Sequence, residues 1–569
     1  MRRNFGFLIV LLVLLAACQV SIFAPPTSTP LPPTATATAT ATPPPPTATL
    51  PPATPTPSLP DVAEYIVRPH PDGDLYVGDR VSFEVIVPDS AVLGAEFSLQ
   101  MMDENGEVLG ETGFAPFGIG GRQQATLSWV WNTAGLEAGA HDLSLTILPD
   151  GPTWTETFSL LPADELARET RLALWAYDES DCCLLYYISG TSAQRDIAAL
   201  LTSADAQASD VMVKLGVEFD EPITVTLMSR VVGHGGFATG EVYISYLDRN
   251  YAGSDFDLVL HHEMVHILDA RLGGNLRPSI FVEGLAVYLT GGHFKPELLM
   301  PRAAALFDLV DEQSGESWYL PLAPLVDNFY QSQHEIGYLE AGALVEYMVD
   351  TWGWGAFDAF YRQIEPGNDG QAQAIDRALQ TQFGIHLSDL EAQFITALKA
   401  QSLSPELRED VRLTVQYYDS VRRYQQMLDP SAYFLTAWLP DGPQMREYGI
   451  TADLTRPPDH VENITLETML VAADEQLQSG HYVQAAETVQ AINAVLTAMA
   501  EGAAQPFTAH PVAEAYYAIA NWLTEMEYQV QRIDMDENGI VAEVSALGSY
   551  LMTLQLSWDG EQVYFEQSQ

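Results

Sequence analysis

The chain of 569 residues has only three cysteines, Cys18, Cys182 and Cys183. So few thiols exclude the disulfide framework that stabilises many small secreted proteins. Adjacent cysteines such as Cys182 and Cys183 rarely form a disulfide, because the eight-membered ring strains the peptide bond between them. Outside the cytoplasm a bridge between them is still an alternative, and the sequence leaves it open.

Basic residues are also scarce. The chain has 25 lysines and arginines against 76 acidic residues, which gives a formal net charge of −51. Only three of the basic residues are lysines: Lys214, Lys295 and Lys399. A surface this acidic repels nucleic acids and anionic lipids, so neither is expected as a partner. The charge identifies neither a substrate nor an oligomeric state.

Apolar runs long enough to cross a membrane are missing as well. The run at residues 7–15 follows Arg2 and Arg3 and is too short to span a bilayer. Residues 15–18, Leu-Ala-Ala-Cys, resemble a bacterial lipobox. The resemblance implies a signal peptide over residues 1–17 and a lipid anchor on Cys18, which would hold the protein outside the cytoplasm on the bacterial cell membrane. An ordinary secretory signal with an incidental cysteine is the alternative.

Residues 18–60 continue from this cysteine into a segment made mainly of threonine, alanine and proline. Such a composition cannot bury a hydrophobic core. At roughly 3 Å per residue in polyproline form, it could hold the folded part up to ~100 Å from the membrane. We therefore expect a stalk over these residues.

Residues 61–162 alternate apolar and polar residues in four short runs, at 81–85, 97–101, 127–131 and 143–147. Alternation with a period of two predicts strands with one buried face. Turn residues such as Asn105 and Gly106 separate these strands at the spacing of a β-sandwich. Residues 135–143 resemble the late-strand pattern of bacterial immunoglobulin-like modules. The resemblance implies an Ig-like β-sandwich that acts as a spacer, and a ligand-binding role is the alternative.

The most informative segment is 257–269, which contains His-Glu-x-x-His as His262, Glu263 and His266. Residues four apart project from the same face of a helix, so two imidazoles can bind one Zn²⁺ while the glutamate acts as a general base. Residues 254–257 predict a capping box at the start of this helix, and Gly273 and Gly274 predict its end. Chance alone produces the motif in about one chain of this length in a hundred.

A second segment supports the interpretation of this motif as a zinc site. Residues 278–289 predict another helix, which ends at Gly291 and Gly292 and carries Glu283 one turn from its start. Sixteen residues separate His266 from Glu283. A short turn sets two helices antiparallel, so the glutamate can face both histidines. Two histidines, one glutamate and a water form the open ligand set of a catalytic zinc site.

Together these two segments resemble the gluzincin metallopeptidases, in particular the peptidase MA-like group, in which HExxH precedes a Glu-Gly-Leu-Ala helix. The resemblance implies one catalytic zinc ion bound by His262, His266 and Glu283, with Glu263 as the base that activates a zinc-bound water. It also implies a peptide or protein substrate.

Other site residues follow from the same resemblance. The aspartate often found four residues after the later glutamate is Val287 here, and Asp269 is expected instead to orient a ligand histidine. Residues 338–353 are similar to the helix that follows the site in this family, where a tyrosine near the start faces the cleft. Tyr338 is therefore the candidate that hydrogen-bonds the oxyanion, with His334 in reserve. Ordinary packing roles for both are the alternative.

Residues 163–402 are expected to form the catalytic domain, an α+β gluzincin-like fold with a helical C-terminal part. Strands at 183–189 and 223–228 should flank a helix at 192–215, and residues 235–246 suggest an edge strand before the zinc helix. In gluzincins a strand at this place pairs with the substrate backbone. A purely structural edge strand is the alternative.

The remaining chain predicts a helical linker region over 403–505 and a small α+β domain over 506–569. The linker region should hold a helix at 405–428 and a tetratricopeptide-like helix pair at 470–499, but a single repeat cannot make a solenoid. Asn538-Gly539 and Asp559-Gly560 predict turns between antiparallel strands. The whole chain is thus expected to be multidomain.

The function expected from these patterns is that of a lipid-anchored, extracytoplasmic zinc peptidase. The first alternative is a surface binding lipoprotein whose zinc domain recognises peptides or cell-wall components without cleaving them. The presence of Glu263 argues against this, because a protein that no longer cleaves is free to lose its base. A purely structural zinc ion fits poorly with an open set of three ligands.

Overall fold

The computed structural model describes residues 59–569 apart from 220, 254, 311–313, 434–440, 537–538, 547–549 and 566–569. Leu59–Gln569 forms one compact unit. The expected signal peptide, Cys18 and nearly all of the stalk lie outside the described residues, as do Ser254 and Asn538. Among the helices that are described, none has the length and apolar composition needed to cross a membrane.

The N-terminal part of the unit contains two β-sheets that share one hydrophobic core. Their strand orders are β1-β3-β7-β6 and β2-β9-β8-β4-β5. After a 3-10 turn η1 (Val62–Glu64), the strands are β1 (Ile66–His70), β2 (Leu75–Tyr76), β3 (Arg80–Ile86), β4 (Ser98–Met102), β5 (Val108–Gly113), β6 (Ala115–Phe117), β7 (Arg122–Asn132), β8 (Gly139–Leu148) and β9 (Thr153–Leu161). Alternate residues of these strands, such as Leu99 and Met101, are fully buried between the sheets, which confirms the predicted period.

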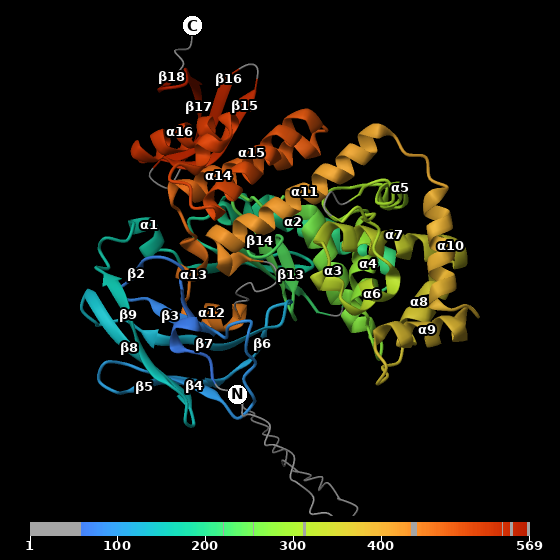
Figure 1. Ribbon diagram of the computed structural model, residues 1–569, viewed down its shortest axis with the longest axis horizontal. Coiled ribbons are helices and arrows are strands. Elements are labelled where there is room, and N and C mark those ends of the chain that lie inside the picture. The colour runs from blue at the N-terminus through green and yellow to red at the C-terminus, as the bar shows by residue number, and fades with distance from the viewer. Residues whose placement is uncertain are drawn as a thin grey trace, which may run out of the picture. The chain divides into compact units, whose positions relative to one another are not determined.

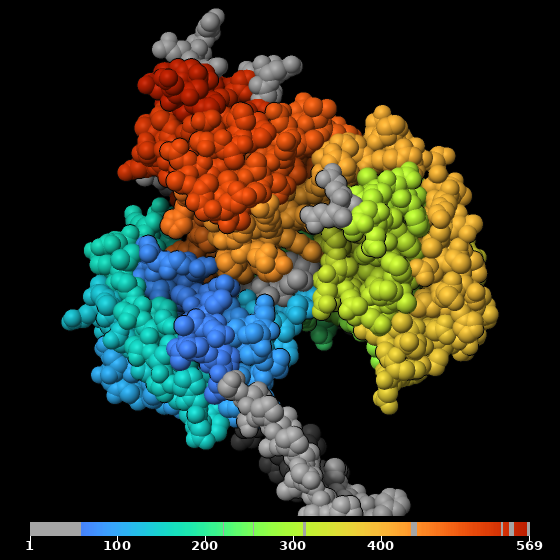
Figure 2. Space-filling model, in the orientation of Figure 1, coloured from blue at the N-terminus to red at the C-terminus, as the bar shows by residue number. Residues whose placement is uncertain are grey.

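This pair of sheets packs directly on the rest of the unit. The register between β3 and β7 shifts near Trp129, whose φ of 50° lies in the left-handed region. Leu127 remains in the core between the two sheets, whereas Trp129 packs in a second hydrophobic cluster with Met445 and Ile450. The indole Nε1 of Trp129 donates to Oδ2 of Asp453 at 3.0 Å. Figure 2 shows the blue sandwich against the orange residues near 450. Both side chains of this hydrogen bond are buried where the sandwich meets the C-terminal part of the unit.

A five-stranded mixed sheet follows, in the order β10-β11-β12-β14-β13. Its elements are α1 (Arg168–Arg171), β10 (Trp175–Glu179), β11 (Cys183–Ile188), α2 (Ser192–Leu215), β12 (Ile223–Met228), β13 (Gly236–Ala238) and β14 (Val242–Ser245). The single edge strand expected over 235–246 is wrong in detail. A turn at Thr239 and Gly240, whose φ is +86°, folds it into a hairpin, so that β14 is internal and β13 is the edge. Cys182 and Cys183 are joined by a disulfide.

The two predicted zinc helices come next, as α3 (Phe256–Leu272) and α4 (Ser279–Thr290). Asp255 caps α3 by accepting hydrogen bonds from the backbone of Asp257 and Leu258, and Gly273 ends the helix. Gly291, in the left-handed conformation, ends α4 as expected. Both helices contribute to the same large core as the mixed sheet, and α3 packs beside β13 and β14 (Figure 1).

The chain then becomes helical, as predicted for the C-terminal part of residues 163–402. The helices are α5 (Leu299–Ala305), α6 (Leu322–Asp327), η2 (Phe329–Gln331), α7 (His334–Trp352), α8 (Trp354–Arg362), α9 (Gln371–Gln382) and α10 (Leu387–Lys399). Of these, α7 packs most closely against α4 and is buried over most of its length. It therefore supports the helix that carries Glu283.

The C-terminal part begins with α11 (Pro405–Leu428), whose Ser404 cap and Pro405 at its start match its predicted first residue. The remaining elements are η3 (Pro430–Ala432), α12 (Gly442–Tyr448), α13 (Ala452–Thr455), α14 (Val461–Gln478), α15 (Tyr482–Ala500), η4 (Pro506–Ala509), α16 (Pro511–Glu525), β15 (Gln529–Asp536), β16 (Gly539–Ala546), β17 (Tyr550–Trp558) and β18 (Val563–Phe565). The last four strands form an antiparallel sheet in sequence order, and the predicted turn at Asp559-Gly560 is confirmed between β17 and β18. Of the other predicted turn, Asn538 lies outside the described residues and Gly539 is the first residue of β16. α11 is an interior element, since Val411 lies in the core that contains α3 and α4, and Tyr417 lies in the core of the C-terminal helices.

Candidate metal centre

Helix α3 presents His262 and His266 on one face, one turn apart, with ring centroids separated by 4.7 Å. Most residues of this helix are buried, and His262 and Glu263 are only 8% and 6% exposed. Polar groups inside an apolar helix are costly unless they have partners. These buried side chains therefore need a polar or charged partner nearby.

Helix α4 supplies that partner in Glu283. Nε2 of His262 lies 3.2 Å, and Nε2 of His266 3.1 Å, from the same carboxylate oxygen, Oε2 of Glu283. Two donors that are each about 2.0–2.1 Å from a tetrahedral zinc ion lie about 3.3 Å from each other. The three donor atoms all lie within 4.8 Å of one another. Their chemistry and spacing therefore fit a single zinc ion.

The glycine that follows Glu283 lets α4 approach α7. A Cβ on Gly284 would lie 2.5 Å from the carbonyl oxygen of Ala341, closer than real Cβ contacts. On the facing helix, a Cβ on Gly342 would lie 2.5 Å from Cγ1 of Val287. Close helix approach needs small residues at the contact, and here it fixes the position of Glu283 relative to α3.

The charges in this cluster favour a bound cation. Burial opposes charge on every member, yet the carboxylate of Glu283 raises the pKa of His266 to about 9. In turn His266, with hydrogen bonds from both histidines, holds the pKa of Glu283 well below its usual value against the effect of burial. Burial lowers the pKa of His262 to about 4, which leaves a neutral imidazole. A neutral imidazole and an ionised carboxylate are the forms that bind a metal ion, so a bound zinc ion would take the place of the proton on His266.

Glu263 lies beside the donors but bonds to none of them among the described contacts. Its Oε2 atom is buried and has no hydrogen-bond partner within the described residues. Burial raises the pKa of its carboxyl group to about 7. A Cβ on Gly236 of β13 would lie 3.4 Å from Oε1 of Glu263, so the edge strand runs past this carboxylate. A buried oxygen of this kind is suited to accept a proton from a reacting water.

Two tyrosines complete the wall of the site. The hydroxyl of Tyr330, in η2, donates to Oε1 of Glu283 at 2.6 Å and so leaves Oε2 to the histidines. The ring of Tyr338, the predicted oxyanion residue, lies 6.2 Å from the ring of His262 and is buried. Burial, followed by Glu283, raises the pKa of Tyr338 well above its usual value, so its phenol keeps its proton and can donate.

Three further histidines lie next to this wall. Nδ1 of His293 is 2.9 Å from Oε2 of the fully buried Glu335, and its ring is 5.9 Å from that of His262. The reserve candidate His334 packs 4.7 Å from His293 and 3.8 Å from His234, measured between ring centroids. Burial lowers the pKa of His334 well below its usual value, so it packs as a neutral ring.

Asp269 occupies a different place from the one expected. Its Oδ2 accepts hydrogen bonds from Nε of Arg277 at 3.0 Å and from the hydroxyl of Tyr361 at 2.9 Å, and its Oδ1 lies 2.6 Å from Arg362. The expected hydrogen bond to a ligand histidine is not among the contacts described for this side chain. Asp269 therefore ties the end of α3 to α8 and acts on His266 only through its charge.

Tyr330, His293 and Glu335 were not predicted. His293 directly follows the two glycines that end α4 and lies ten residues after Glu283. This closeness in sequence could have indicated that its side chain lies near the site. Tyr330 and Glu335 lie 47 and 52 residues beyond Glu283 and carry no motif that links them to the site. They reach it only because the helical part folds back on α4.

No model of a known protein family matches the sequence, and no curated protein matches it either. The functional assignment therefore depends on the donor geometry and on the motif that supplies it.

Proposed function

We propose that the chain is a zinc-dependent, gluzincin-type peptidase that hydrolyses peptide bonds. The observation that carries this proposal is the convergence of His262, His266 and Glu283 on one point, with the unpartnered oxygen of Glu263 beside them. Three protein donors leave one position of a tetrahedral zinc ion open for water or substrate, as catalytic sites require. A structural zinc site would be closed by a fourth protein ligand.

The chemistry divides between the ion and the side chains. A zinc ion bound there would supply Lewis-acid chemistry, lowering the pKa of a coordinated water to about 7 and polarising the substrate carbonyl. Glu263 takes a proton from the attacking water and passes it to the leaving amine. Tyr338 donates a hydrogen bond to the developing oxyanion, and His293, whose Nδ1 pairs with Glu335, packs against the ring of Tyr338 with centroids 4.4 Å apart.

The substrate would be held by the free edge of the sheet. β13 is one of the two edge strands of the described sheet, at the opposite edge from β10, and Gly236 brings it past Glu263. An extended peptide can add to such an edge through backbone hydrogen bonds. The scissile bond would then lie between the edge strand and the zinc donors.

We also propose that the protein is a lipoprotein, anchored at Cys18 and held outside the cytoplasm by residues 18–60, with an Ig-like sandwich between stalk and catalytic domain. The lipobox-like sequence and the stalk composition support this. The substitution Cys18→Ala should move the expressed protein from the membrane fraction to the soluble fraction. A wild-type protein that is already soluble would contradict the anchor.

The peptidase proposal is tested with the chain from Leu59 onward and the variant Glu263→Gln, each incubated with a mixed peptide library, with zinc content measured on both. We expect cleavage by the wild type alone and about one zinc ion per chain in both proteins. Bound zinc without cleavage by either protein would contradict the peptidase and favour a binding lipoprotein. Equal cleavage by both proteins would remove Glu263 from the mechanism.

A further inference from the structure

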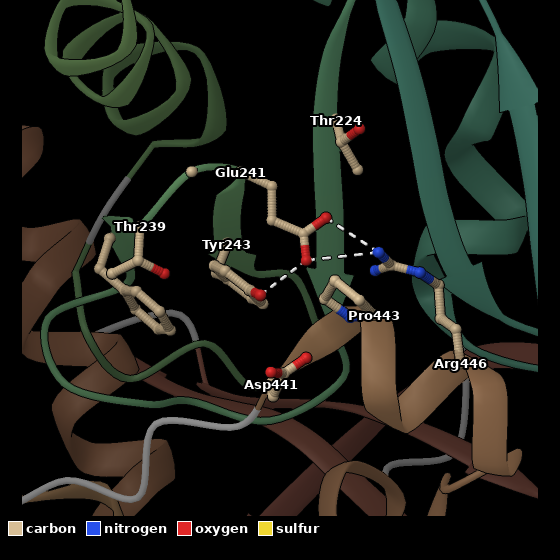
Figure 3. Close-up of a pocket in the computed structure, with 9 residues that line it drawn as sticks. Thr224, Thr239, Glu241, Tyr243, Asp441, Pro443 and Arg446 are labelled. Carbon is tan, nitrogen blue, oxygen red and sulfur yellow. Dashed lines mark hydrogen bonds and ion pairs between the residues drawn. The ribbon is translucent and has the colours of Figure 1, made fainter. Parts of the chain in front are cut away.

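A cavity lies on the opposite face of the mixed sheet from α3 and α4. It has a volume of about 550 Å³ and opens between the β13–β14 hairpin and the start of α12 (Figure 3). Residues of both elements line it, including Phe237, Thr239, Glu241, Asp441 and Arg446. None of these residues belongs to the candidate metal centre, so the cavity needs an explanation of its own.

The edge strand connects this cavity to the metal centre. Successive side chains of a strand point to opposite faces of the sheet. Gly236 faces α3, where a Cβ would lie 2.4 Å from Cγ1 of Val259 and 3.4 Å from Glu263. The next residue, Phe237, faces the other way and stacks on Tyr243, with ring centroids 4.6 Å apart and an interplanar angle of 11°. One short strand thus presents one face to Glu263 and the other to the cavity.

The backbone of β13 is arranged to accept another strand. The amide of Ser245 donates to the carbonyl of Gly235 at 2.7 Å, and the amide of Thr239 donates to that of Glu241 at 3.0 Å. Because hydrogen-bonded and non-hydrogen-bonded pairs alternate in an antiparallel ladder, the backbone groups of Gly236 and Ala238 point away from β14. No other described strand pairs with this edge.

A peptide paired with β13 would therefore alternate between the two faces. A residue level with Gly236 faces Glu263, whereas residues level with Phe237 or Thr239 face the cavity. These positions are one and three residues away along an extended chain. The cavity is consequently within reach of a side chain close to the scissile bond.

The charges around the cavity favour a cation. The carboxylate of Glu241 accepts a hydrogen bond from the hydroxyl of Tyr243 at 2.6 Å and pairs with Arg446 at 3.0 Å. The guanidinium of Arg446 also lies 4.0 Å above the ring of Tyr186, so it is held in place. Asp441 adds a second carboxylate, which caps α12 by accepting from the amide of Gln444 at 2.9 Å. Two carboxylates against one guanidinium leave a net negative charge among the residues that line the cavity.

We propose that this cavity is a subsite for a lysine or arginine side chain of the peptide that lies along β13. The proposal rests on the peptidase function and adds a substrate class to it. The basic residue occupies a fixed position within three residues of the scissile bond. Its ammonium or guanidinium group lies near Asp441 and Glu241, and its aliphatic stem packs on Phe237.

The test compares three variants with the wild type. Asp441→Asn keeps a good helix cap and removes the charge, and Thr239→Trp fills the cavity. Thr396→Trp, on the exposed surface of α10, is the matched control for a bulky substitution. Cleavage of a peptide library is read by mass spectrometry for residue preference at each position, and circular dichroism confirms that each variant is folded.

The expected wild-type profile shows a basic residue at one fixed position. Asp441→Asn should lower cleavage of basic peptides by about two- to fivefold, the range of an exposed ion pair, and leave peptides with glutamine there unchanged. Thr239→Trp should remove the preference, and Thr396→Trp should keep it. A profile without a basic position, or a uniform loss across all peptides, would overturn the subsite.

A binding measurement tests the subsite independently of peptidase activity. Fluorescence anisotropy measures the binding of paired lysine and glutamine peptides to Glu263→Gln, alone and combined with Asp441→Asn. Tighter binding of the lysine peptide, weakened by Asp441→Asn, would support the subsite even if the wild type cleaves nothing. Equal binding of both peptides would overturn the subsite while leaving any observed cleavage intact.

Discussion

The hydrogen bond from Tyr330 to Glu283 gives a sharp test of the metal centre. Tyr330→Phe removes a hydroxyl that lies 2.6 Å from Oε1 of Glu283 and keeps the ring. A hydrogen bond to a charged group contributes about 1.5–3 kcal/mol. Groups that orient a metal ligand typically contribute 10- to 100-fold in metal affinity, which is about 1.4–2.7 kcal/mol. The first range is the expected loss of stability, and the second predicts a zinc dissociation constant about 10- to 100-fold higher in the variant.

The assay is a zinc titration against a chromophoric chelator, with thermal unfolding as a check on the fold. Tyr319→Phe is the control, because Tyr319 also donates to a glutamate, Glu391 at 3.3 Å, but lies outside the donor cluster. The control should bind zinc as tightly as the wild type. Unchanged zinc affinity in Tyr330→Phe would refute the orienting role of this hydroxyl, and equal losses in both variants would show a general effect of removing a buried hydroxyl.

Three further predictions concern residues that hold the helices of the site in place. Gly284→Ala should destabilise the protein by about 1–3 kcal/mol and weaken zinc binding, because the added Cβ forces α4 away from α7. Gly355→Ala is the control, since its Cβ would meet no atom within 4 Å, and thermal unfolding and zinc titration should both give wild-type values. Asp269→Asn should lower the free energy of unfolding by about 3 kcal/mol, because it removes the buried carboxylate that pairs with two partly exposed arginines. Weaker zinc binding with an unchanged thermal unfolding curve would contradict this. Burial raises the pKa of Glu340 well above 4.5, so the folded protein keeps this proton to higher pH than the unfolded chain, and the stability it contributes declines as the pH rises. Glu340→Gln keeps an acceptor for the amide of Leu320, so its melting temperature should equal that of the wild type near about pH 4 and exceed it near about pH 8. An equal difference in melting temperature at both pH values would contradict this.

The elements that were predicted well are those specified by local patterns. Ser192–Leu215, Ile223–Met228 and Pro405–Leu428 have the predicted bounds, because caps, prolines and apolar periodicity lie within each segment. The hairpin at β13 and β14 was missed because its turn at Thr239 and Gly240 interrupts only a few residues of strand-like sequence. Periodicity alone does not separate one strand from a tight hairpin.

The donor set was predictable for the same reason. His262 and His266 are one turn apart, and Glu283 follows in the next helix, so their convergence depends on a short piece of chain. The contacts of Asp269 were not predictable, because Arg362 lies 93 residues away. The contact between Trp129 and Asp453 joins residues 324 apart and was equally hidden. Long-range packing decides such partners, and a single sequence carries little signal of it.

The central claim is that one zinc ion is bound by these three side chains. Its most direct test is a crystal structure of the zinc-loaded chain from Leu59 onward, with anomalous diffraction data on both sides of the zinc absorption edge. We predict one strong anomalous peak about 2.0–2.2 Å from Nε2 of His262, Nε2 of His266 and Oε2 of Glu283. A zinc peak held by other residues, or none at this point in a zinc-loaded crystal, would contradict the account.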